Sequence, residues 1–282
     1  AVAPPTPPTG ADAPLLSVIM PVYNPPADVL DQALASVAAQ RYARWELCIA
    51  DDASTAPHVQ ATLARHAAND ERVRVVYRPQ SGHIAAASNS ALDVARGEFV
   101  VLLDHDDLLD PDALGAIAEV VAGEPLVDLI YSDEDKLDFA GRRVTPFFKP
   151  AWSPNLLLSS NYVTHLAAAR RTLVAEIGGF RHETVGSQDH DLFLRLGERA
   201  RAVAHIPRIL YSWRMAAGST AAASSAKPYT VAAAGRALAG AIERRGLAAT
   251  LEPSHLNGLF IARHRPPGRA RVSLVVLGAG AA

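Results

Sequence analysis

Residues 98–110 read Glu98-Phe99-Val100-Val101-Leu102-Leu103-Asp104-His105-Asp106-Asp107-Leu108-Leu109-Asp110, an unbroken apolar run that stops at a cluster of carboxylates. An apolar run of this length, bounded by Gly97 and by acids, is typical of a strand buried on both faces of a parallel sheet. Open α/β sheets bind their ligands at the carboxyl ends of the strands. We therefore expect the acids that follow Leu103 to lie at a ligand site.

Two of these acids have the spacing of a metal site. Asp104 and Asp106 are separated by one residue just past the predicted strand, so both carboxylates can turn toward one point. Hard oxygen ligands of this kind suit Mg²⁺ or Mn²⁺ bound to a diphosphate. The alternative is a solvated acidic turn ahead of a helix that starts near Pro111, with Asp110 as its N-cap.

The composition is that of a globular chain. Its 282 residues are 49% hydrophobic, which is enough for a core in one large or two small domains. The net charge of −2, with acids and bases interspersed, argues against a nucleic-acid-binding protein. The one cysteine, Cys48, is expected to be a buried hydrophobe, and a disulfide within this sequence is excluded. No stretch approaches the roughly 18 consecutive apolar residues of a membrane helix.

Strands and helices alternate from residue 15 to about residue 135. We expect strands at 15–20, 45–50, 72–77 and 98–103, and helices at 29–40, 57–68, 84–95 and 111–122. This alternation predicts an α/β fold with right-handed βαβ units, in which helices flank a Rossmann-like, mostly parallel central sheet. The first strand lacks a following Gly-x-Gly-x-x-Gly sequence, which argues against a dinucleotide cofactor.

After residue 128 the elements become shorter and mixed. We expect strands at 129–132, 144–148, 163–169, 202–207 and 209–214, and helices at 171–177, 189–198 and 228–245. Residues 1–14 are rich in proline and predict a disordered linker. Residues 251–282 predict a linker and, because residues 271–277 repeat the apolar character of the first strand, the start of a truncated second domain.

Several polar motifs occur together in this chain. They are Pro21-Val22-Tyr23-Asn24, Asp51-Asp52-Ala53-Ser54, Ser81-Gly82-His83-Ile84-Ala85-Ala86-Ala87-Ser88-Asn89, the Asp104-x-Asp106 pair, Tyr131-Ser132-Asp133-Glu134-Asp135-Lys136 and Ser187-Gln188-Asp189-His190-Asp191-Leu192. In combination, over about residues 15–245, they resemble family 2 glycosyltransferases of the GT-A fold, closest to domains of bacterial O-antigen and rhamnan assembly enzymes. The resemblance implies one domain at 15–250, with a nucleotide-sugar-binding half at 15–135. It also implies a smaller, mixed acceptor and catalytic half at 136–250.

The resemblance also implies a donor site on the first half. Pro21 and Tyr23 would flank the nucleobase, and Asp52 would accept a hydrogen bond from a ring N–H. Gly82 would let the backbone approach the ligand. The alternatives are a strand-end aromatic for Tyr23, a helix N-cap for Asp52 and a structural turn for Gly82.

In the same resemblance, Asp104 reaches the ribose and diphosphate and Asp106 is the direct metal ligand. Arg214 would hold the leaving diphosphate, unless it forms a surface ion pair. Lys149 and Asp135 are further candidates for sugar or phosphate contacts.

The predicted general base is Asp189, since the family carries a carboxylate at the start of a helix in its second half. The preceding member of the usual Glu-Asp pair is Gln188 here, so the role falls on Asp189 alone. A helix N-terminus stabilises the carboxylate anion, which suits a proton acceptor only when the acceptor hydroxyl is held within about 3 Å. The alternative is a simple N-cap ahead of Leu192.

Ser212 departs from the family pattern. Related domains tend to read Tyr-His-Trp-Arg where this chain reads Tyr211-Ser212-Trp213-Arg214, and serine is a poor metal ligand. Three alternatives stay open. The metal affinity is reduced, a water fills the missing ligand position, or another histidine such as His190 serves as the ligand.

We therefore expect an inverting, non-processive glycosyltransferase that uses Mn²⁺ or Mg²⁺. The donor would be a pyrimidine nucleotide sugar, carrying UDP or dTDP, and the acceptor a glycan or lipid-linked glycan in bacterial surface polysaccharide synthesis. The resemblance further implies a cytoplasmic location, contact with the inner membrane that is peripheral if present, and further domains in the same polypeptide. The alternatives are a sugar nucleotidyltransferase, disfavoured because residues 21–26 lack a glycine-rich basic loop, and an inactive nucleotide-sugar or glycan-binding module.

Overall fold

The computed structural model describes residues 6–10, 13–215, 228–256 and 258–265, together with Gly268 and Ser273. The linker expected at 1–14 lies partly outside these residues, and the strand expected at 271–277 lies outside them except for Ser273. Among the described residues, no helix is both long and apolar enough to span a bilayer.

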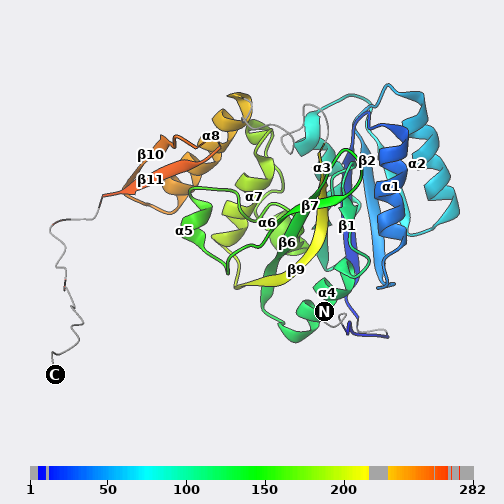
Figure 1. Cartoon of the computed structure of the whole chain (residues 1–282), viewed down its shortest axis with the longest axis horizontal. Coiled ribbons are helices and arrows are strands. Elements are labelled where there is room, and N and C mark those ends of the chain that lie inside the picture. Colours follow the sequence, from blue (N-terminus) through cyan, green and yellow to red (C-terminus); the bar gives the residue numbers. More distant parts are fainter. Residues whose placement is uncertain are drawn as a thin grey trace.

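A central sheet organises the described part of the chain (Figure 1). Its first half contains four parallel strands in the order β3 (Val73–Tyr77), β2 (Trp45–Asp51), β1 (Leu16–Val22) and β4 (Phe99–Leu102). Every residue of β1 and β2 is buried, because helices cover both faces of these strands. The predicted Rossmann-like parallel arrangement is confirmed.

The second half of the sheet is mixed. β8 (Ala167–Arg170) runs antiparallel to β4 and to β6 (Val127–Leu137), and β9 (Ala202–Arg214) runs parallel to β6. β5 (Leu108–Leu109) and β7 (Arg143–Phe147) add antiparallel edges. Where we expected two strands at 202–207 and 209–214, the structure has β9 alone, with a shift in its pairing that skips Pro207 and Arg208. Proline has no N–H to donate to the neighbouring strand, so the pairing is interrupted at Pro207.

Helices form a layer on each face of the sheet. One face carries α1 (Ala27–Ala38), α2 (Pro57–Asn69) and α4 (Ala113–Gly123). The other carries α3 (His83–Asp93), α6 (Arg171–Glu176), α7 (Gln188–Gly197) and α8 (Pro228–Arg244). Successive side chains of β1 point to opposite faces of the sheet, so Val18 and Met20 pack on the first helix layer and Ile19 packs on the second.

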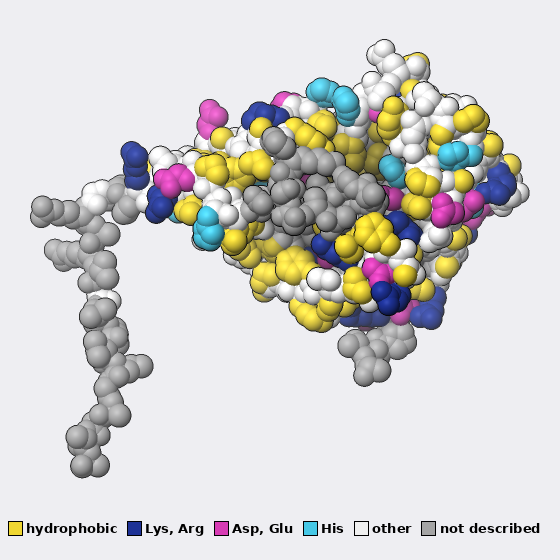
Figure 2. All heavy atoms as spheres, turned by 45° about the horizontal axis from the view of Figure 1, so that its top comes forward, with side chains coloured by type: hydrophobic (Ala, Val, Ile, Leu, Met, Phe, Trp, Pro, Cys, Tyr) yellow, Lys and Arg dark blue, Asp and Glu magenta, His cyan; other side chains and the backbone are white. Residues whose placement is uncertain are grey.

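Short elements complete the fold. They are α5 (Pro154–Leu157), the 3-10 turn η1 (His182–Thr184), and the antiparallel pair β10 (Ala249–Pro253) and β11 (Phe260–His264). Figure 1 shows β10 and β11 beside α8, and the buried Phe260 ring lies 3.7 Å from the position of a Cβ on Gly235. Ordered structure thus continues into the interval that we expected to be a linker, because Phe260 supplies an apolar contact to α8. On the face shown in Figure 2, Lys and Arg are interspersed with Asp and Glu over the described residues.

Candidate active site

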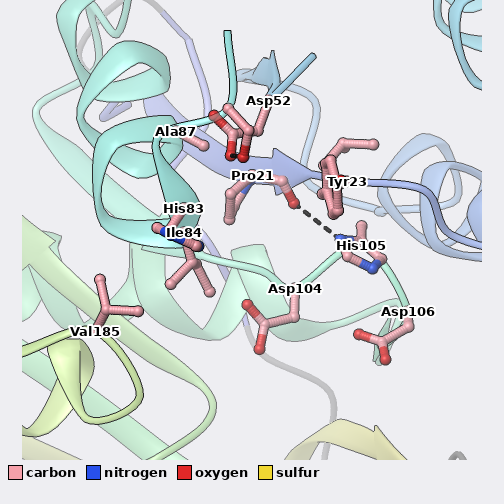
Figure 3. A pocket seen from close by; sticks show the side chains of 12 residues that line it. Pro21, Tyr23, Asp52, His83, Ile84, Ala87, Asp104, His105, Asp106 and Val185 are labelled. Atoms are coloured by element: carbon pink, nitrogen blue, oxygen red, sulfur yellow. Dashed lines mark hydrogen bonds between the residues drawn. The ribbon is translucent and has the colours of Figure 1, made fainter. Parts of the chain in front are cut away.

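The carboxyl ends of β1, β2 and β4 meet at one cavity of about 420 Å³. Its walls include Pro21 near the end of β1, Tyr23 just after β1, Asp52 after β2, and Asp104 and Asp106 after β4. Figure 3 shows Asp104 and Asp106 on one side of this cavity and Asp52 on the other. The carboxyl ends of these three strands are therefore brought together. Because Pro21, Tyr23, Asp52 and Asp104 are predicted donor-binding residues, we call this space the donor cavity.

Backbone strain occurs in and beside the donor cavity. His83, the first residue of α3, lines the cavity and has φ of +63°, and Ala53, next to the lining residue Asp52, has φ of +59°. Residues with side chains rarely adopt this left-handed region, and such positions cluster at functional sites. Tyr23, which is 49% exposed, stands at the mouth of the cavity and is free to pack on a planar ligand.

Asp52 is held by groups of the protein. Its carboxylate accepts hydrogen bonds from Arg78 Nε at 2.8 Å, Ser81 Oγ at 2.7 Å and Gly82 N at 2.9 Å. Burial raises the pKa of Asp52, but the hydrogen bonds from Gly82, Ser81 and Arg78 outweigh it, and the pKa lies below its usual value. Asp52 is therefore an anion that orders the 78–82 turn, and its contact with a nucleobase stays a prediction.

Gly82 is required by its protein neighbours. A Cβ at this position would lie 2.6 Å from Arg78 Nη2 and 2.8 Å from Ala86 Cβ. Its amide N–H points at Asp52, so glycine lets the turn close onto that carboxylate. A ligand contact at Gly82 is not needed to explain the residue.

The acidic turn after β4 concentrates negative charge. Asp107 is fully buried, and it accepts hydrogen bonds from the Tyr211 hydroxyl at 2.6 Å and from Arg214 N at 2.7 Å. Burial, and then the charge of Asp106, raises the pKa of Asp107 well above its usual value. Burial also raises the pKa of Asp104, with a further contribution from the Asp106 charge. Carboxylates held together in this way favour the binding of a cation.

Asp104, Asp107 and His165 form a candidate metal site. Each offers one ligand atom, and these atoms all lie within 4.8 Å of one another. Two carboxylates and an imidazole are a donor set that suits Mn²⁺. We had predicted the pair Asp104 and Asp106; Asp104 belongs to the compact group, and Asp106 lies beside it on the donor cavity.

His165 is the residue that the sequence reasoning missed. It lies in the irregular segment 158–166, although we expected a strand over 163–169, and its ring stacks on Tyr211 at 4.6 Å between centroids. His190, the histidine suggested from the sequence, is buried with Nε2 bonded to the Leu157 carbonyl at 2.7 Å. Ser212 Oγ donates to Asp135 at 2.6 Å, so this serine completes a structural contact.

Arg214 braces the acidic turn. Its Nε donates to the Asp106 carbonyl at 2.7 Å and its Nη2 donates to Gln32 Oε1 at 2.9 Å. The loop that follows, at 216–227, lies outside the described residues. The role of Arg214 in holding a diphosphate stays a prediction.

Asp189, on the first turn of α7, faces a second cavity of about 610 Å³. Asn161 Nδ2 donates to Asp189 Oδ2 at 2.7 Å. Asp104 lines this cavity as well as the donor cavity, so the two spaces adjoin at Asp104. Because most of its lining residues belong to the predicted acceptor half, we call the second space the acceptor cavity. Asp104 and the predicted base Asp189 thus line the same cavity, and Asp106 lines the adjoining one.

The sequence model of glycosyl transferase family 2 matches residues 17–178, which contain β1 to β8 and the donor cavity strands. O-antigen biosynthesis protein RfbC of Myxococcus xanthus is 38% identical to this chain over 264 residues, covering 93% of the chain and 20% of RfbC. The chain belongs to glycosyl transferase family 2 and is a glycosyltransferase domain. It spans about a fifth of the length of RfbC.

Solved structures confirm the GT-A fold. Residues 1–349 of S. aureus TarS, in complex with UDP-GlcNAc, superpose with a TM-score of 0.64 at 20% identity, covering 81% of this chain and 66% of that one. The mannosyltransferase PcManGT from Pyrobaculum calidifontis, in complex with GDP-Man and Mn²⁺, gives a TM-score of 0.59 at 21% identity, covering 87% and 77%. At this identity the likeness shows the fold.

Proposed function

We propose that this domain transfers a sugar, with inversion, from a pyrimidine nucleotide sugar to a hydroxyl of a glycan or lipid-linked glycan in bacterial surface polysaccharide synthesis. The observation that carries the proposal is the position of Asp104, which lines both the donor cavity and the acceptor cavity that contains Asp189. A sugar bound at Asp104 is accessible from the side of Asp189. The similarity to RfbC, whose name describes O-antigen biosynthesis, supports the surface polysaccharide.

Asp189 is the proposed base. It would accept the proton of the acceptor hydroxyl while that oxygen bonds to the anomeric carbon, and the bond from this carbon to the diphosphate breaks with its electron pair leaving on the nucleoside diphosphate. Asp189 lies on the first turn of α7, and the Asn161 amide donates a hydrogen bond to its Oδ2 at 2.7 Å. Inversion requires that the hydroxyl attacks the anomeric carbon from the face opposite the departing diphosphate.

The residues around Asp104 fit a divalent cation. Asp104, Asp107 and His165 would hold it, and Asp106 is included in the proposed ligand set because it lines the donor cavity beside Asp104. When bound, the cation would offset the negative charge that develops on the leaving diphosphate. The solved complex of PcManGT with Mn²⁺ supports this choice of metal.

The two halves of the domain have different proposed roles. Residues 15–135 bind the nucleotide sugar, with Pro21, Tyr23 and Asp52 around the base, and residues 136–250 bind the acceptor. The length of RfbC supports further domains in the same polypeptide. A lipid-linked acceptor would place the reaction in the cytoplasm, at the face of the inner membrane.

A thermal-shift panel of UDP, dTDP, GDP and CMP, each with and without Mn²⁺, tests the donor. We expect UDP or dTDP to raise the midpoint of unfolding, with a larger shift when Mn²⁺ is present. A larger shift with GDP would contradict the pyrimidine donor. No shift with any of the four would favour the inactive-module alternative.

A further inference from the structure

A buried ion pair lies behind the acceptor cavity. Lys149, which follows β7, has a side chain that is 0% exposed, and its Nζ lies 3.1 Å from Glu134 Oε2 on β6. Neither residue is used by the proposed reaction. Burying two charges is costly unless further hydrogen bonds satisfy them, so the partners of this pair are informative.

Apart from each other, the two charged groups have their hydrogen-bond partners among the described residues in one short segment, Val163 to His165. Lys149 Nζ donates to the carbonyl oxygens of Val163, at 2.6 Å, and of His165. Glu134 Oε2 accepts from Thr164 Oγ1 at 2.7 Å and from His165 N at 3.0 Å. The pair therefore fixes the peptide groups on both sides of His165.

This piece of backbone has no regular secondary structure of its own, although the His165 ring stacks on Tyr211 and the Val163 side chain is buried. It lies in the segment 158–166, which contains neither helix nor strand. Thr164 has φ of +35°, a strained value for a residue with a side chain. Thr164 and His165 nevertheless line the cavities that contain Asp104 and Asp189. Their geometry must be set by contacts from outside the segment.

We propose that Lys149 and Glu134 are positioning residues that aim the His165 imidazole at Asp104 and Asp107. The inference rests on the metal site proposed above. Groups that orient a metal ligand typically account for about tenfold to hundredfold in metal affinity. An apolar pair of the same volume could fill the space but could not hold the carbonyl and N–H groups of residues 163–165.

The same strand offers a matched control. Asp128, near the start of β6, pairs with Arg170 Nε at 2.7 Å, and Arg170 Nη2 donates to the Val127 carbonyl at 2.8 Å. This pair also fixes backbone with a buried carboxylate. It lies six residues before Glu134 on β6, a distance of about 20 Å along an extended strand.

The experiment is a titration of the purified chain with Mn²⁺ alone, following free Mn²⁺ by electron paramagnetic resonance, beside thermal unfolding without metal. Lys149→Met and Glu134→Gln are expected to weaken Mn²⁺ binding by about tenfold or more. Arg170→Met is expected to lower the unfolding midpoint but leave Mn²⁺ affinity unchanged. Thr164→Val, which removes one hydrogen bond and no charge, is expected to weaken Mn²⁺ binding severalfold and covers the case in which Lys149→Met does not fold.

Folded Lys149 or Glu134 variants that bind Mn²⁺ as tightly as the unaltered chain would overturn the inference while leaving the metal site intact. Equal loss of Mn²⁺ affinity in Arg170→Met would also overturn it, because the effect would then be general destabilisation. Failure of the unaltered chain to bind Mn²⁺ would instead refute the metal site of the proposed function, and the inference with it.

Discussion

Asn161 Nδ2 lies 2.7 Å from Asp189 Oδ2, so an amide from the irregular segment 158–166 donates a hydrogen bond to the predicted base on α7. The carboxylate fixes which way the amide points, because only the NH₂ group can donate to it. Asn161 Oδ1 is then left buried without a hydrogen-bond partner among the described residues. Leaving this buried oxygen unpaired costs free energy. The amide nevertheless keeps this orientation, which indicates that its hydrogen bond to Asp189 is the contact that is maintained.

Asn161→Ala should therefore affect the reaction more than donor binding. Loss of a hydrogen bond to a charged group costs about 1.5–3 kcal/mol, which corresponds to a fall in kcat of roughly 10-fold to 100-fold. The KM for the nucleotide sugar should stay within about twofold of its original value, since Asn161 lines the acceptor cavity. Steady-state kinetics measure both values, and a raised KM with unchanged kcat would contradict the role of Asn161.

Asp104→Asn should abolish tight Mn²⁺ binding without destabilising the metal-free chain. The loss of affinity should exceed the roughly tenfold to hundredfold produced by altering an outer partner of a ligand. The unfolding midpoint without metal should stay the same or rise, because the change removes a like charge beside the buried Asp107. Calorimetric titration and thermal unfolding check the two parts, with the exposed Asp93→Asn as control.

Ser212→His should not improve metal binding, although the resemblance found in the sequence predicts histidine at this position. Ser212 is 7% exposed and its hydroxyl is committed to Asp135. An imidazole would break this contact and overfill the site, at a cost of about 1–3 kcal/mol in the free energy of unfolding. The same Mn²⁺ titration tests this prediction. An increase in the Mn²⁺ affinity of Ser212→His would show that position 212 faces the metal and would contradict the prediction.

Asp128 should make stability depend on pH. Hydrogen bonds from Arg201, with further bonds from Arg170, hold the pKa of Asp128 well below its usual value despite burial. A carboxyl with a lowered folded-state pKa contributes stability above its unfolded-state pKa, about 3.9, and this contribution is lost as the pH falls. Asp128→Asn should thus cost about 2–3 kcal/mol at pH 6 and progressively less toward pH 3. Denaturant unfolding at several pH values measures the difference, and a cost independent of pH would refute it.

Much of the fold could be predicted because its signals are local. The apolar runs at 16–22, 45–51 and 99–102 are buried strands, and Asp52 and Asp104, which follow the second and third runs, do face one cavity. Because parallel strands end at the same edge of the sheet, the positions of Asp52 and Asp104 at this edge follow from the strand assignment.

The missed features depend on contacts between distant segments. His165 meets Asp104 across about sixty residues of sequence, from a segment without helical or strand periodicity. Lys149 and Asp135 were suggested as ligand contacts, but the structure buries both against protein partners. A single sequence carries no signal for which carboxylate a lysine will meet.

Turnover of Asp189→Asn, measured beside nucleotide binding, tests the central claim most directly. We expect transfer to fall by about 10²-fold or more, as for loss of a general base, while the thermal shift with UDP or dTDP stays unchanged. Asp93→Asn, an exposed change on α3, should leave both unaltered. Turnover of Asp189→Asn within about twofold of the original would contradict the assignment of Asp189 as the base.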